Sequence, residues 1–235
     1  MKGLGAVLLL LAISASVSMA QSAQRPATSS AGYTDLYHVH FNKAAIGQAS
    51  ALADVLKTQD PKAPMPGHFV VLRHQEGDDW DYCVIEHLGT KATIDAATAT
   101  GPSTLRNLSE WHTDTFAAGP AWADFARAMG LGAAGGKGVY AVAIWRAAPG
   151  HRDQLEQALK QQPPSKVPIG HALLMHLEGG AWQYLAIDHY NSWQDFAADE
   201  AATTPQTGTG KDPWSQIREH SNYHTDTLTD RIAPK

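Results

Sequence analysis

The sequence predicts an α+β protein made of two copies of one unit, because it repeats itself and because each copy combines strand-like with helix-like spacing. The segment 37–47 reappears as 140–150, an offset of 103 residues. Further matching blocks follow in the same order: 67–68 with 170–171, 80–87 with 182–189, and 105–115 with 217–227. Matching blocks in the same order indicate an internal duplication, which constrains the fold more strongly than any single local pattern does.

Each copy opens with a strand followed by a helix. Apolar residues alternate at Tyr37, Val39 and Phe41, and the second copy repeats this alternation over 140–144. Period two is the signature of a strand. Leucines at helical spacing follow in both copies, around 52–56 and 155–159, which predicts a helix after each first strand.

A hairpin, a second helical region and a last strand complete each copy. The hairpin strands are the short apolar runs 69–72 and 80–85, or 172–175 and 182–187, with polar turns between them. The helical regions are 105–111 in the first copy, and 192–201 and 214–221 in the second. The repeated His-Thr-Asp-Thr motif then predicts the fourth strand. The order β-α-β-β-α-β is the ferredoxin-like arrangement, a sheet with helices on one face.

The chain divides into five segments on this interpretation. Residues 1–20 have one lysine, an apolar run and a small-residue ending, which predicts a signal peptide and a secreted or periplasmic protein. The remaining segments are a flexible leader (21–33), repeat 1 (34–118), a glycine-rich linker with a short helix (119–137) and repeat 2 (138–235).

Composition argues against several classes of partner. The net charge is −5 and no basic cluster occurs, which argues against nucleic acid. No segment after the signal peptide predicts a membrane span. Cys83 is the only cysteine, so an intrachain disulfide is excluded.

The order of elements over 34–116 and 138–230, together with their duplication, resembles a tandem member of the dimeric α/β-barrel superfamily. In that superfamily two ferredoxin-like units, from two chains or one fused chain, place their open sheet faces together to form a barrel. The resemblance therefore implies a pseudo-dimer within one chain. Antibiotic-biosynthesis-type monooxygenases, small stress-responsive proteins, chlorite dismutases and dye-decolourising peroxidases share the architecture, so the fold does not choose the chemistry.

The repeated His-Thr-Asp-Thr motif supplies the catalytic candidates. On a strand His112 and Asp114 point to one face, as do His224 and Asp226. A carboxylate beside an imidazole orients it and raises its basicity, which prepares a general base. The alternative is a polar pair that fixes the last strand and the contact between the two copies.

A difference between the copies supplies further candidates. His38 and His40 share a strand face, whereas the matching positions hold Ala141 and Ala143. A fused duplicate can keep one working pocket, so both histidines are predicted ligand-binding residues. Two histidines at this spacing can also ligate a metal with Glu86. The sequence places no further ligand, so it predicts no metal centre.

Aromatic and basic residues complete the predicted ligand site. Alternation places Trp80, Tyr82 and Glu86 on one face, either as the wall of an aromatic cavity or as core beneath helices. Trp182, Tyr184 and Asp188 match them. Arg106 and Arg218 precede the last strand of each copy, where they can hold a carboxylate.

The sequence thus predicts an exported barrel protein that binds a small organic, in particular aromatic, molecule between sheet and helices. The favoured activity is that of a cofactor-independent monooxygenase or an isomerase-like enzyme. The alternatives are a non-catalytic periplasmic binding or structural module and a haem-binding barrel enzyme. The sequence does not identify a cofactor.

Overall fold

The computed structural model describes residues 32–58, 67–95, 105, 107–132, 138–161, 167–204, 208, 210 and 212–234. The predicted signal peptide, most of the predicted leader, residues 133–137 of the predicted linker and Arg106 lie outside these residues. No helix in the described ranges is long and apolar enough to cross a membrane.

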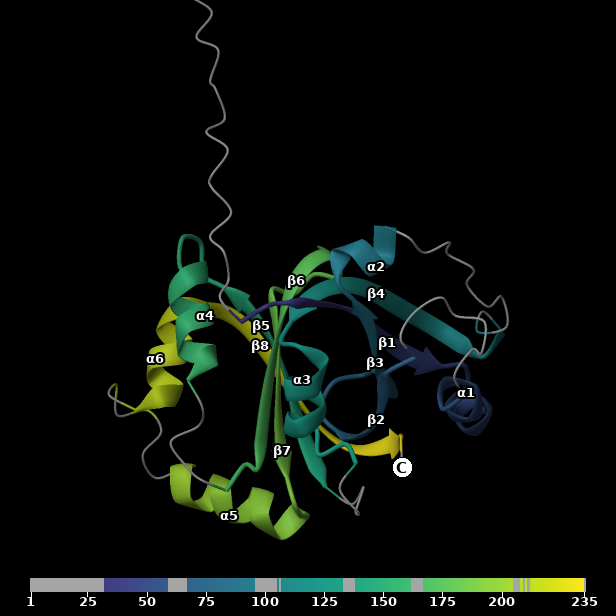
Figure 1. Cartoon of the computed structure of the whole chain (residues 1–235). Helices are drawn as coiled ribbons and strands as arrows, with labels where there is room; N and C mark the ends of the chain where they lie inside the picture. Colours follow the sequence, from purple (N-terminus) through teal and green to yellow (C-terminus); the bar gives the residue numbers. More distant parts are fainter. Residues whose placement is uncertain are drawn as a thin grey trace, which may run out of the picture. The chain divides into compact units, whose positions relative to one another are not determined.

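Eight antiparallel strands form a closed barrel (Figure 1). The strands are β1 (Asp35–Ala44), β2 (Phe69–Glu76), β3 (Tyr82–Gly89), β4 (Ser109–Gly119), β5 (Val139–Ala147), β6 (Gly170–Gly179), β7 (Tyr184–Tyr190) and β8 (Ser221–Ala233). Their order around the barrel is β1-β3-β2-β8-β5-β7-β6-β4. Two seams, β2 with β8 and β4 with β6, join the first four strands to the last four.

Helices stand outside the barrel or across its end. They are α1 (Ala49–Leu56), α2 (Lys91–Asp95), α3 (Trp122–Ala128), α4 (Arg152–Lys160), α5 (Trp193–Thr203) and α6 (Pro213–His220). Figure 1 shows α3 drawn across the barrel opening, and its Phe125 is buried in the interior cluster. An α+β barrel is therefore confirmed.

Strand alternation separates the interior of the barrel from its outer face. Tyr37, Val39 and Phe41 are buried in the interior cluster, which also takes residues from β5 and β7. Residues between them, such as His38 and His40, face outward. Two smaller apolar clusters lie under α1 and under α4, because those helices bury their leucines against the outer face of the sheet.

Two local predictions differ from the structure. The predicted helix at 105–111 is reduced to 3₁₀ conformation at Leu105 and Asn107, because β4 already begins at Ser109. Trp80 and Tyr82 do not share a face: residues 77–79 and Asp81 bend, β3 starts only at Tyr82, and the alternation does not extend back to Trp80. Trp80 consequently packs in the interior, while Tyr82 lies under α1.

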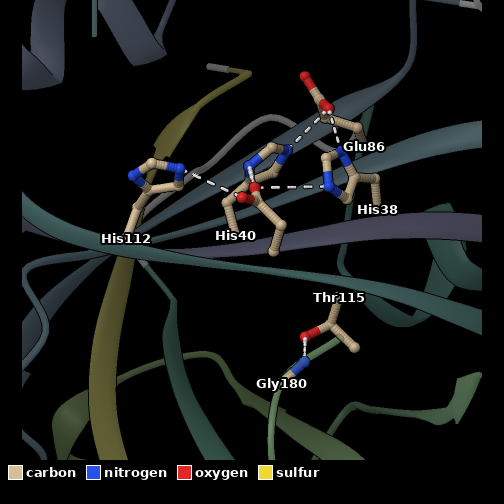
Figure 2. A network of polar contacts seen from close by, with 7 residues as sticks. His38, His40, Glu86, His112, Thr115 and Gly180 are labelled. Carbon is tan, nitrogen blue, oxygen red and sulfur yellow. Dashed lines mark hydrogen bonds and ion pairs between the residues drawn. The ribbon is translucent and has the colours of Figure 1, made fainter. Parts of the chain in front are cut away.

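Hairpin turns from one set of strands press against the last strand of the other. A Cβ atom on Gly179 would lie 2.1 Å from the carbonyl oxygen of Asp114, and one on Gly77 would lie 2.4 Å from that of Asp226. Next to Gly179, the N–H of Gly180 donates to Oγ1 of Thr115 at 3.0 Å (Figure 2). Only glycine allows this approach, so the two turns fix the seams.

Candidate functional site

Five polar side chains gather on the outer face of β1, β3 and β4. His38 on β1 lies opposite Glu86 on β3, and His40 lies opposite Asp114 on β4. His112 follows on the same face, two residues before Asp114. Because β1 lies between β3 and β4, its two histidines are flanked by one carboxylate on each side. These residues are called the histidine–carboxylate cluster below.

Each histidine of β1 contacts both carboxylates (Figure 2). His40 Nε2 lies 3.0 Å from Glu86 Oε2, and its Nδ1 lies 2.7 Å from Asp114 Oδ1. For His38 the corresponding distances are 3.4 Å from Nδ1 to Glu86 and 3.5 Å from Nε2 to Asp114. His112 Nε2 lies 3.2 Å from the other oxygen of Asp114. The predicted pairing of His112 with Asp114 is therefore present, within a larger network.

The network strongly changes the proton affinities of its members. Burial alone would lower the pKa of His40, but hydrogen bonds to Asp114 and Glu86 and their charges raise it to about 9. Burial likewise would raise the pKa of Glu86, yet the bonds from His38 and His40 lower it to about 2. The hydrogen bond from His40 lowers the pKa of Asp114. In the absence of a bound ligand, His40 is thus a protonated imidazolium that lies between the carboxylates of Glu86 and Asp114.

The matching face of the second half is different. The strand register is the same, but Ala141 and Ala143 stand opposite Asp188 and Asp226. Asp188 instead accepts a hydrogen bond at 2.7 Å from Nδ1 of His171, which comes from β6. Among the residues that the structure describes, this face therefore carries no second copy of the cluster.

The second His-Thr-Asp-Thr motif is held by different neighbours. His224 Nε2 lies 3.4 Å from Asp226, and its ring stacks on Trp145. Arg218 contacts Nδ1 of His224. Burial, together with the charge of Arg218, lowers the pKa of His224, and burial raises that of Asp226. Arg218 thus contacts a histidine of its own half, and its predicted role in holding Asp188 or a ligand carboxylate stays a prediction.

Solved structures of similar shape share this barrel. An anthrone oxidase-like protein matches with a TM-score of 0.58 and 13% identity, over 85% of this chain and 92% of its own. A proposed monooxygenase from Lactobacillus acidophilus matches at 0.54 and 10% identity, over 84% and 94% of the two chains. A second proposed monooxygenase, from Fusobacterium nucleatum, matches at 0.52 and 6%, over 85% and 93%.

The protein has the dimeric α/β-barrel fold. At these identities the likeness concerns the fold alone. No protein-family model matches the sequence, and no curated protein matches it.

Two predicted ligand residues of this dimeric α/β barrel lie away from the cluster. The Tyr82 hydroxyl donates to the carbonyl of Ala49 at the start of α1, at 2.8 Å. Trp80 lines a cavity of about 270 Å³ together with its counterpart Trp182 and with Phe41. Tyr82 shares the outer face of β3 with Glu86, as predicted, but packs under α1, whereas Trp80 lies in the interior.

Phe116 is a neighbour of the cluster that sequence reasoning missed. Its ring stacks on His38 with 4.8 Å between centroids, and 44% of the residue is exposed. The sequence could have indicated it, because residues 112, 114 and 116 are two apart along β4 and their side chains therefore point to the same face.

Three members of the cluster are close enough to share a metal ion. His38, His40 and Glu86 each offer one ligand atom, and these atoms lie within 4.8 Å of one another. Among the described residues they form the group with this property. Imidazole and carboxylate are ligands of Zn²⁺ and of non-haem iron.

Proposed function

We propose that the protein is an enzyme of the monooxygenase or isomerase type, which acts on a small organic molecule at the histidine–carboxylate cluster. The observation that carries this proposal is the asymmetry of the two halves. A matching register exists in both, but only the first bears two histidines between two carboxylates. Partly exposed ion pairs contribute little to stability, so packing alone gives little reason to keep the cluster in one half.

The cluster can remove a proton and stabilise the charge that results. His112 is half exposed and is oriented by Asp114, as a general base needs to be. A substrate with an acidic C–H group beside a carbonyl or phenol can place that group at His112. The oxygen that gains negative charge then faces His38 and His40, which stabilise it directly or through a bound ion.

The fate of the carbanion distinguishes the two activities. Return of the proton to another carbon gives an isomerase. Reaction with O₂ gives an oxygenase, in which a CH₂ group becomes a carbonyl, one oxygen atom stays in the product and the other leaves as water. Exposed Phe116 beside His38 supplies a flat apolar surface for a planar ring, which favours an aromatic substrate.

Anthrone is the first substrate to test, because one protein of similar fold is described as anthrone oxidase-like. We expect O₂ uptake and incorporation of labelled oxygen into the product by the full chain. His112→Gln should lower kcat by roughly 10²–10⁴-fold, the usual contribution of a general base.

The matched control is His151→Gln, which introduces the residue of the matching position, Gln48, at a site outside the cluster. Its kcat should equal that of the wild type. Equal rates for His112→Gln and the wild type would remove His112 as the base. Ligand binding with no turnover of any C–H acid would favour a non-catalytic binding module.

We further propose that the barrel consists of two fused ferredoxin-like repeats, 34–118 and 138–235, joined by the linker 119–137. The support is the order of strands around the barrel. The first four strands run β4-β1-β3-β2, and the last four run β8-β5-β7-β6, so that each strand of the first set has a counterpart at the same place in the second. We also propose that the protein is exported, and the support is the apolar run and small-residue ending of residues 1–20. The mass of the mature protein from a secreting host should correspond to a chain that begins at Gln21; an unprocessed mass would argue against the signal peptide.

A further inference from the structure

We infer that His38, His40 and Glu86 bind one divalent transition-metal ion, and that Asp114 positions the two histidines for it. This inference deepens the proposed function, since it assigns an ion to the same site. Metal binding is measured without turnover, so the two proposals can fail separately.

The spacing of the nitrogen and oxygen atoms suits a shared ion. Zinc binds imidazole nitrogen and carboxylate oxygen at about 2.0–2.2 Å, so tetrahedral ligand atoms lie roughly 3.3 Å from one another. Glu86 Oε2 lies 3.4 Å from His38 Nδ1 and 3.0 Å from His40 Nε2. Both distances are close to that edge length.

The opposite ring nitrogens have the partner that metal-bound histidines need. His40 Nδ1 and His38 Nε2 both face Oδ1 of Asp114, at 2.7 and 3.5 Å. A histidine that ligates a metal usually donates its other N–H to a carboxylate, which fixes the ring and raises its basicity. Glu86 therefore lies on the ligand side of the histidine pair and Asp114 on the supporting side.

The surroundings leave room for an ion and for substrate. Two histidines and one carboxylate are three protein ligands, which leave at least one position for water or a substrate oxygen. The side chain of Glu86 is 47% exposed and those of His38 and His40 about one fifth, so an ion can reach the site from solvent. The ligands come from paired strands, β1 and β3, which hold them in place before the ion arrives.

The second half gives an internal comparison. Its register brings Asp188 and Asp226 to the equivalent places, but Ala141 and Ala143 replace the ligands. The inference therefore requires one ion per chain.

The test is metal binding by the full chain, purified without a histidine tag and stripped with a chelator. Calorimetric titration with Zn²⁺ alone should give one equivalent, and Co²⁺ should give visible absorption bands typical of histidine and carboxylate ligands. His38→Ala/His40→Ala should abolish this binding. Asp114→Asn should weaken it by roughly 10–100-fold, as loss of a supporting carboxylate does.

Two further variants keep the test decisive. Glu86→Gln conserves shape and should also remove binding, which covers a failure of the double variant to fold. His171→Ala removes a histidine that pairs with a carboxylate in the second half, so it should leave stoichiometry and affinity unchanged. Equal affinity for wild type and for folded Glu86→Gln or His38→Ala/His40→Ala overturns the inference, as does a wild type that binds neither ion.

The outcomes also separate this inference from the proposed function. Specific metal binding without turnover of any substrate upholds the metal site and contradicts the enzyme. Turnover by a chain that binds no metal upholds the enzyme and contradicts the metal site.

Discussion

His171 and Asp188 form a histidine–carboxylate pair outside the cluster, and their pH response follows from their contacts. Burial by itself lowers the pKa of His171, but its bond to Asp188, the charge of Asp188 and the carbonyl of Leu159 together raise it. Because the pKa of His171 is higher in the folded chain than in the unfolded chain, protonation of His171 stabilises the fold. This stabilisation is fully present below the unfolded-chain pKa of about 6.5 and is lost as pH rises through the raised pKa. Asp188→Asn should therefore lower the pKa of His171, measured by NMR titration.

The same substitution should also cost more free energy of unfolding at about pH 6 than above the raised pKa, measured by urea unfolding. A His171 signal that titrates identically in both chains would show that Asp188 does not set its charge.

Single residues of the cluster could be found from the sequence only in part. The contrast of His38 and His40 with two alanines was visible, and so was the shared face of His112 and Asp114. The grouping of all five needed the register, because that alone places Glu86 and Asp114 on opposite sides of the histidine pair. Trp80 was wrongly placed on the same face as Tyr82 and Glu86, since a bend interrupts the alternation before β3 begins.

The turns between hairpin strands are the elements on which the seams depend most directly. Gly179 has φ +115° and its missing Cβ would meet the backbone of β4, whereas Gly150 has φ +84° with open space around it. Gly150→Ala should cost only the strain of a left-handed residue, about 1–2 kcal/mol. Gly179→Ala should cost about 1–3 kcal/mol more, because β4 must also move. Urea unfolding of the two variants measures the difference, and equal losses would mean that the turn does not press on β4.

The strands agree with the sequence-based prediction, whereas one predicted helix does not. All eight strands were predicted, because alternation, short apolar runs bounded by polar turns and the repeated His-Thr-Asp-Thr motif are local signals. The helix expected at 105–111 is confirmed only as 3₁₀ conformation at Leu105 and Asn107, because the rest of that segment belongs to the start of β4. A short amphipathic pattern does not distinguish a helix from a strand.

The molecule as a whole is closed by contacts between distant strands. The interior cluster joins Val39 and Trp80 with Val142 and Trp182, and the seams β2–β8 and β4–β6 complete the ring. Either half alone would expose an apolar sheet face and two strand edges. We expect residues 34–118 and 138–235, expressed separately, to aggregate or to associate. Size-exclusion chromatography and urea unfolding test this: a monomeric half with cooperative unfolding would refute a barrel that needs both.

The central claim is that the working site lies on the outer face of β1, β3 and β4. The most direct measurement is NMR of the histidine side chains during titration of the full chain with a planar aromatic ketone such as anthraquinone. The account predicts shifts of the His38, His40 and His112 signals at saturation, with His171 and His224 unchanged. Shifts confined to His171 and His224, or to His176 beside the cavity at Trp182, would contradict it.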